Sequence, residues 1–154
     1  EDLAKINLMI EKLIYKKKLF FLIVRGKYRN KKGISFFTPK EATQQFGYMK
    51  HQKGHVIQPH EHRKRLTKIM TTTEVILLLK GSLKVDFYDK KRKYLSSRVL
   101  NAKDIIMLVD GGHGFKVLKN VEMIEVKQGP YNLIKDKIKF AGIYDKKTNV
   151  KSKK

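Results

Sequence analysis

The chain has 154 residues, a hydrophobic content of 41% and a formal net charge of +22, from 36 Lys and Arg against 14 Asp and Glu. This length suits one domain with its own core and is too short to expect two. The absence of cysteine excludes disulfides, zinc–thiolate sites and cysteine nucleophiles, so any metal must be bound through nitrogen and oxygen.

The basic residues do not favour a nucleic-acid partner. Only six of them are Arg, and the lysines are scattered along the chain, without aromatic residues interleaved in the manner of a stacking platform. Nucleic-acid recognition relies on the two-pronged guanidinium group and on aromatic side chains that stack on bases. We therefore expect a solvated basic surface and keep nucleic-acid binding as a remote alternative.

The apolar runs do not indicate a membrane partner. The longest early run, residues 19–24, is far shorter than the roughly 20 apolar residues that span a bilayer. Charged residues interrupt the apolar positions of the first eighteen residues, which is unlike a secretory signal. We expect a cytoplasmic protein.

The first segment has the periodicity of a helix. Apolar residues recur at intervals of three and four, at Leu3, Ile6, Met9, Ile10, Leu13 and Ile14. This spacing predicts an amphipathic N-terminal helix, followed by a lead-in strand, within residues 1–25. We expect the apolar stripe to pack on a β-barrel or on a second subunit, and so predict a homodimer.

From Gly26 onward, short apolar or alternating runs separated by turn residues predict an antiparallel β-barrel over residues 26–144. The clearest elements are residues 75–79 and 83–88, which we expect to form a hairpin through Lys80, Gly81 and Ser82. Further strands are expected at residues 45–49, 56–57, 105–109, 115–118, 121–126 and near 138–144. Residues 145–154 are polar and basic, and we expect a disordered tail.

The candidate chemistry begins with histidine. Four of the five histidines lie between positions 51 and 62, and His60 and His62 would share one face of an extended strand. Glu74 opens an apolar strand, where a carboxylate is costly unless it is paired or bound to a cation. Further along, Glu125 and Lys127 are two apart, so both can face inward as an acid/base or ion pair.

Two stretches resemble the motifs of the cupin superfamily. The first combines a glycine, a His-x-His pair, a glutamate and a second glycine, at Gly54, His60, His62, Glu74 and Gly81. Residues 101–115 resemble the second motif, which ends in a third histidine, His113. The interval between His62 and Glu74 is longer than in the family, which makes residues 63–73 an insertion. The resemblance implies a jelly-roll barrel in which His60, His62, Glu74 and His113 bind one divalent metal.

Three imidazoles and a carboxylate suit Fe, Mn, Ni, Cu or Zn better than Ca or Mg. Such an ion keeps free positions for water, dioxygen or a small-molecule substrate. We expect a metal-binding cupin that binds or converts a small polar molecule, carbohydrate-derived or a carboxylate, with Glu125 and Tyr131 as candidate catalytic groups. An enzyme of this kind would be a dioxygenase or an isomerase. A non-catalytic sugar- or metabolite-binding cupin and a metal-free sugar-nucleotide epimerase remain the alternatives.

Overall fold

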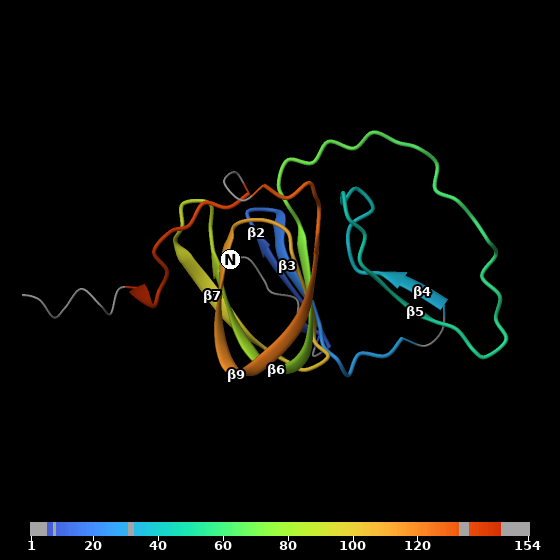
Figure 1. The fold of residues 1–154 in the computed structure, drawn as a ribbon, viewed down its shortest axis with the longest axis horizontal. Coiled ribbons are helices and arrows are strands. Elements are labelled where there is room, and N and C mark those ends of the chain that lie inside the picture. Colours follow the sequence, from blue (N-terminus) through green and yellow to red (C-terminus); the bar gives the residue numbers. More distant parts are fainter. Residues whose placement is uncertain (1–5, 8, 31–32, 133–135, 146–154) are drawn as a thin grey trace, which may run out of the picture.

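The computed structural model describes residues 6–7, 9–30, 33–132 and 136–145, and this part of the chain is all-β (Figure 1). The strands are β1 (Ile6–Asn7), β2 (Ile10–Tyr15), β3 (Lys18–Val24), β4 (Gly33–Phe36), β5 (Gly47–Lys50), β6 (Glu74–Tyr88), β7 (Tyr94–Asn101), β8 (Ile105–Leu108) and β9 (Gly112–Lys127). The all-β class expected from the sequence is confirmed. Among the described residues, no helix is long and apolar enough to cross a membrane.

The expected N-terminal helix is wrong for the described residues of that segment. β2 and β3 form an antiparallel hairpin there, and its turn residues Lys16 and Lys17 both have positive φ. The pairing with β3 is irregular between Leu13 and Ile14. The extra residue there is Phe20 of β3, so β2 keeps its alternation. Ile10 and Leu13 lie on opposite faces of β2 and pack against different core clusters, and apolar residues on both faces imitate a helical spacing. Residues 1–5 and 8, and the expected tail beyond residue 145, lie outside the described residues.

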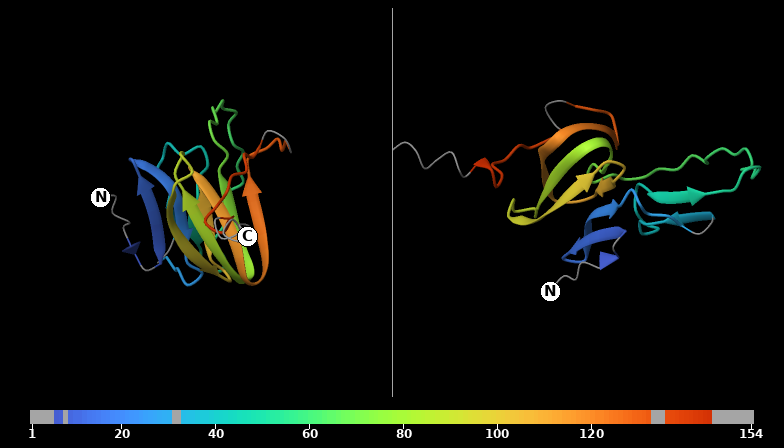
Figure 2. Two further views of the ribbon diagram at one scale, coloured as in Figure 1. Left: turned by 90° about the vertical axis from the view of Figure 1, so that its left-hand side faces the viewer. Right: turned by 90° about the horizontal axis from the view of Figure 1, so that it is seen from below.

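The main sheet is antiparallel, in the order β1-β2-β3-β8-β6-β7, and β9 lies along the other side of β6. β8 pairs with the beginning of β6 and β7 with its end, whereas β9 pairs with β6 over its whole length. The sheet curls, and β6 and β9 bend together, as the views in Figures 1 and 2 show. No strand of the described chain covers the second edge of β9, so the sheet is a half-barrel.

The hairpin expected around Gly81 is also wrong, because β6 continues through it. Gly81 has a φ of +85°, and the register between β6 and β9 shifts three times between Leu78 and Leu83. The buried positions change there from even numbers, such as Leu78, to odd numbers, such as Leu83 and Val85. Gly81 therefore lies in a bulge that lets both halves of a bent strand face the same core.

The other expected strands have mixed outcomes. The runs 115–118 and 121–126 are two parts of the single strand β9, and 105–109 corresponds to β8. The run 45–49 is displaced to β5, which pairs with β4 in a separate two-stranded sheet. Residues 56–57 and the described residues of 138–144 are not strands. Position 56 lies in the segment of residues 51–73 that joins β5 to β6 and is exposed from residue 52 to residue 72.

The core lies on both faces of the curled sheet. The inner cluster comprises Phe21, Ile23, Ile76, Leu78, Leu83, Val85, Phe87, Leu100, Ile106 and Leu108. The outer cluster comprises Leu22, Val24, Phe37 and Met107. Alternate residues of β3 enter the two clusters, which is why its sequence is a continuous apolar run. The rings of Phe21 and Phe87 stack within the inner cluster, with centroids 3.9 Å apart.

A buried carboxylate, Asp104, fixes the turn between β7 and β8. It accepts hydrogen bonds from the backbone N–H groups of Gly26 (2.8 Å) and Asn101 (3.0 Å), and from Nη1 of Arg25 (2.8 Å). Arg25 also donates to Glu11 on β2. This network joins the end of β3 to β2 and to the β7–β8 turn, so that β8 is held in line beside β3.

Candidate functional site

The bend of β6 and β9 brings together two of the four residues that the cupin-like motifs single out. Glu74 is the first residue of β6, and His113 is near the start of β9. Nε2 of His113 lies 3.1 Å from Oε2 of Glu74, and the side chain of Glu74 is only 9% exposed. Both residues continue the inward-facing rows of their strands, because Glu74 shares the parity of Ile76 and His113 pairs with Phe87. The pair therefore lies at the open end of the half-barrel.

Two lysines surround the carboxylate of Glu74. Nζ of Lys127 lies 3.9 Å from Oε1 of Glu74, directly across the β6–β9 ladder, and Nζ of Lys137 lies 3.8 Å from the same oxygen. The hydrogen bond with His113 lowers the pKa of Glu74 to about 2, from a usual value of 4.5. The charges of His113, Lys137 and Lys127 act in the same direction, and burial opposes them. Glu74 is thus an anion at neutral pH.

The two candidate catalytic residues lie beside this group. Oε1 of Glu125 is 3.7 Å from Nζ of Lys127, as expected for two inward-facing residues two apart on a strand. Nζ of Lys127 also lies 4.9 Å from the centroid of the Tyr131 ring. Lys127 therefore links Glu74 to both residues. We define these five residues, Glu74, His113, Glu125, Lys127 and Tyr131, as the mouth cluster.

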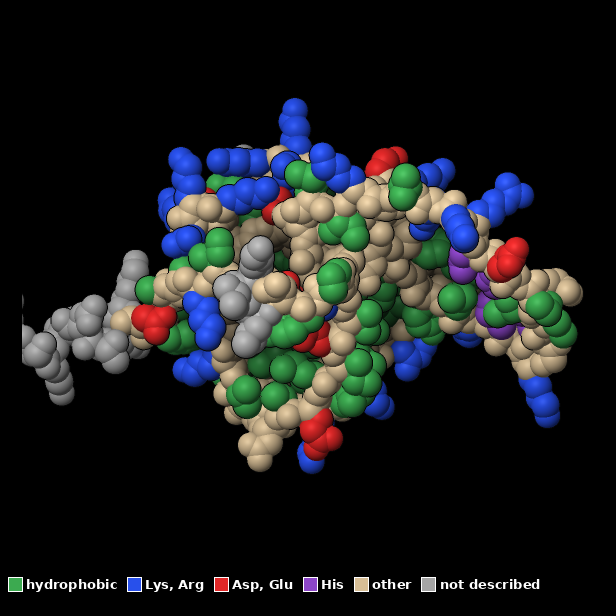
Figure 3. Space-filling model, turned by 45° about the horizontal axis from the view of Figure 1, so that its top comes forward, with side chains coloured by type: hydrophobic (Ala, Val, Ile, Leu, Met, Phe, Trp, Pro, Cys, Tyr) green, Lys and Arg blue, Asp and Glu red, His purple; other side chains and the backbone are tan. Residues whose placement is uncertain are grey.

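His60 and His62 lie elsewhere, in the exposed segment 51–73. Figure 1 shows this segment as a long loop that runs away from the curled sheet, and the histidines visible in Figure 3 lie at one end of the molecule. The rings of His60 and His62 are neighbours, with centroids 5.4 Å apart, and Nδ1 of His60 is 2.9 Å from the carbonyl oxygen of Gln58. The rings of His51 and His55 stack in the same segment, with centroids 4.3 Å apart.

Of the four residues of the expected metal site, the structure therefore brings together Glu74 and His113 and leaves His60 and His62 apart from them. They contain no group of three or more His, Asp or Glu placed to hold a metal ion. Glu74 and His113 offer one oxygen and one nitrogen, a donor pair that suits a first-row transition metal. A cation on Glu74 would have to replace its hydrogen bond with His113 and compete with two ammonium groups. The arrangement as it stands is a hydrogen-bonded ionic cluster.

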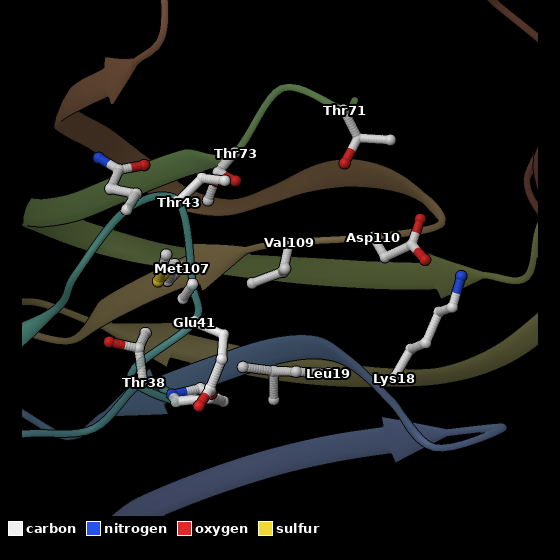
Figure 4. A pocket seen from close by; sticks show the side chains of 13 residues that line it. Lys18, Leu19, Thr38, Glu41, Thr43, Thr71, Thr73, Met107, Val109 and Asp110 are labelled. Atoms are coloured by element: carbon white, nitrogen blue, oxygen red, sulfur yellow. The ribbon is translucent and has the colours of Figure 1, made fainter. Parts of the chain in front are cut away.

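A separate pocket of about 600 Å³ lies beside β3 and β8, next to the outer cluster (Figure 4). Its lining combines the end of β8 and the residues after it with threonines from residues 38–44 and 71–73. Lys18 and Asp110 lie at one end, as Figure 4 shows. No residue of the mouth cluster lines this pocket, and no sequence motif points to it.

Lys137 is the member of this neighbourhood that sequence reasoning missed. It follows the last strand, in a part of the chain without apolar periodicity, so nothing local indicates that it returns to Glu74. On the face shown in Figure 3, apolar side chains occupy the middle and basic side chains stand mainly around them.

No family model, no curated protein and no solved structure matches this chain. The function of the chain is therefore inferred from its residues and their geometry.

Proposed function

We propose that the protein binds a small polar molecule at a divalent-metal centre in the mouth of a cupin-type β-barrel. The observation that supports this most is the contact between Glu74 and His113. These residues come from two different motifs, and they meet on the inner face of the curled sheet at its open end. In the cupin pattern they are two of the four metal ligands.

His60 and His62 would complete the ligand set. Residue 73, the end of the loop that carries them, directly precedes Glu74, and eleven residues separate His62 from Glu74. A chain of this length spans up to roughly 40 Å when extended, so it is long enough to fold back over the mouth while β6 stays in place. A bound ion of this kind supplies a Lewis acid for a ligand oxygen.

The remaining residues of the mouth cluster would recognise the ligand. Lys127 offers an ammonium group to a carboxylate or a sugar hydroxyl, and Tyr131 offers a ring face and a hydroxyl beside it. Glu125 is on the same row as Lys127 and is placed to accept a proton or a hydrogen bond. These groups suit a small, polar, oxygen-rich molecule.

The test is the metal content of the purified protein, before and after reconstitution with Fe(II), Mn, Ni, Cu or Zn. We expect close to one ion per chain, lost in the His60→Ala, His62→Ala double variant and in His113→Ala. A His51→Ala, His55→Ala double variant is the matched control, because it removes two stacked histidines from the same loop. Metal that persists in His113→Ala, or no metal in any sample after reconstitution, would refute the proposal.

One observation favours a second candidate, metal-free binding of an anionic metabolite. Lys127 and Lys137 both approach Oε1 of Glu74 within 4 Å and would repel a cation there. In this case ligand binding is unaffected by a chelator but weakened in Lys127→Gln. The metal-centred site predicts the opposite response to the chelator. A thermal-shift screen of sugars, sugar nucleotides and small carboxylic acids, with and without chelator, separates the two.

A further inference from the structure

The pocket beside β3 and β8 has one wall of fixed shape, the loop of residues 38–46. The side chain of Gln45 donates to three backbone carbonyl oxygens of this loop, at 2.9 to 3.2 Å, and accepts from Oγ1 of Thr38 at 2.8 Å. Oγ1 of Thr38 accepts in turn from the backbone N–H of Phe46 at 3.1 Å. Residues of this loop line the pocket. Because internal hydrogen bonds set the shape of the loop, this wall is formed before any ligand binds.

A second link joins the loop to the residues that precede β6. Gln128 follows β9, and its Oε1 accepts from the backbone N–H of Thr73 at 2.6 Å. Nε2 of the same side chain donates to Oε1 of Gln44 at 3.4 Å. Gln44 and Thr73 both line the pocket, and they come from two segments that are far apart in the sequence. Gln128 therefore holds these two parts of the wall beside each other.

The floor of the pocket is aliphatic. Leu19, Met107 and Val109 form it, from β3, β8 and the residue after β8 (Figure 4). The described residues that line the pocket include no aromatic side chain. A nucleobase or a sugar ring would therefore find no ring to stack on. An aliphatic chain suits this floor, and the flexible side chain of Met107 can adapt to its shape.

The charges of the pocket differ from those of the chain as a whole. The sequence has 36 Lys and Arg against 14 Asp and Glu. The described lining of the pocket has one lysine, Lys18, and two carboxylates, Glu41 and Asp110. Phosphorylated ligands are bound by groups of Arg and Lys, so this lining does not suit them. It suits a ligand that carries an ammonium group.

Two opposite charges lie at one end of the pocket. Figure 4 shows the charged groups of Lys18 and Asp110 pointing toward one another. Among the described residues, Asp110 forms its ion pair with Lys90 instead, with 3.2 Å between Nζ and Oδ2. The side chain of Lys90 is 58% exposed, against 12% for Asp110, so water screens this ion pair and it is easily exchanged. The carboxylate of Asp110 is therefore open to a ligand.

An α-amino acid carries an ammonium group and a carboxylate on one carbon, which matches a carboxylate and an ammonium group that face each other. We propose that this pocket binds an α-amino acid with an aliphatic or thioether side chain. The ligand's ammonium group pairs with Asp110, its carboxylate pairs with Lys18, and its side chain lies on the aliphatic floor. The volume of about 600 Å³ is in the range of small-molecule sites. The site is separate from the mouth cluster and needs no metal.

Isothermal titration calorimetry of the full chain, in the presence of a chelator, tests the proposal. The probes are L-leucine and L-methionine, with two analogues of leucine that each lack one charge: isoamylamine has no carboxylate, and isocaproic acid has no ammonium group. We expect both amino acids to bind, and each analogue to bind about tenfold more weakly or less. L-Glutamate, which would place a third charge on the aliphatic floor, should not bind.

Four substitutions locate the ligand. Asp110→Asn should weaken leucine binding about tenfold, and Lys18→Gln by a smaller factor because this lysine is exposed. Lys90→Gln is the matched control for Asp110→Asn: it removes the same ion pair but leaves the carboxylate, so it should bind leucine at least as tightly as the wild type. Ala42→Leu fills part of the pocket without changing a charge, and should abolish binding.

The proposal is overturned if neither amino acid binds the wild type up to about 10 mM, or if isocaproic acid binds as tightly as leucine. Equal losses in Lys90→Gln and Asp110→Asn, or unchanged affinity in Ala42→Leu, would also overturn it. Lys127→Gln separates this site from the mouth cluster and should leave leucine binding unchanged. A loss in Lys127→Gln but not in Asp110→Asn would place the ligand at the mouth and refute the pocket. Far-UV circular dichroism checks that each variant is folded.

Discussion

Replacing Glu74 with Gln should destabilise the protein by an amount that depends on pH. Each tenfold change in an acid dissociation constant corresponds to about 1.4 kcal/mol, so the fall in the pKa of Glu74 from 4.5 to about 2 is equivalent to about 3 kcal/mol. The hydrogen bond with His113 is the largest contribution. Lys137 is 56% exposed, and water screens its share. We therefore expect a loss of about 2 kcal/mol in the free energy of unfolding at pH 7.

The direction of the pH dependence follows from the lowered pKa. The folded protein releases the proton of Glu74 more readily than the unfolded chain does, so the carboxylate stabilises the fold above about pH 4.5. This contribution decreases as the pH falls from about 4.5 towards 2, where the folded-state carboxylate also becomes protonated. The wild type and Glu74→Gln should therefore approach equal stability at the acidic end.

Urea denaturation between pH 7 and pH 2 measures this difference, in the presence of a chelator so that only protein charges contribute. Glu122→Gln is the control, because its ion pair with Lys80 is exposed on both sides, and we expect a change within about 0.5 kcal/mol at every pH. If the Glu74→Gln difference stays constant from pH 7 to pH 2, or is no larger than the control, the electrostatic account of the mouth cluster is wrong.

Two further substitutions test the architecture through the melting temperature and urea midpoint. In Gly81→Ala the new methyl group would overlap the carbonyl oxygen of Asn120 at a φ of +85°, so we expect a loss of about 3 kcal/mol or more. Gly54→Ala, at a φ of +84° with open space around it, should lower the free energy of unfolding by only about 1 kcal/mol. Equal losses in the Gly81 and Gly54 variants would contradict the bulge at Gly81. Asp104→Asn leaves Arg25 without one carboxylate partner and weakens two backbone contacts, and should cost about 2 to 4 kcal/mol; a change below about 0.5 kcal/mol would contradict the network.

The strand content could be predicted from the sequence, but the continuity of the strands could not. Alternation along residues 83–88 indicated the buried row of Leu83, Val85 and Phe87, but Asp86 and Tyr88 on the other face are buried too. Glycine at position 81 is equally suited to a turn and to a bulge, and only the presence of β9 across from it decides between them. Likewise, β2 has a helical spacing because Ile10 and Leu13 lie on its opposite faces and pack against different core clusters. In both places the strand departs from a simple alternation of buried and exposed residues.

The candidate site was predictable only in part, for a related reason. The cupin-like motifs paired Glu74 with His113, and these side chains are in contact in the structure. The set of four metal ligands stays a prediction, since His60 and His62 lie on the exposed loop. Lys137 was missed because a residue after the last strand has no pattern that indicates its position. Local sequence constrains strands well, whereas the path of loops depends on contacts with distant residues.

The pairing of β3 with β8 has a consequence for synthesis on the ribosome. β3 contains six consecutive apolar residues without proline or charge, a composition typical of segments that aggregate. Its first neighbour, β2, is made just before it, but β8 begins only at Ile105. At 5 to 20 residues per second, one edge of β3 stays bare for on the order of 4 to 16 s in every nascent chain. The yield of this protein in cells therefore depends on protection of that edge during translation as well as on the stability of the finished fold.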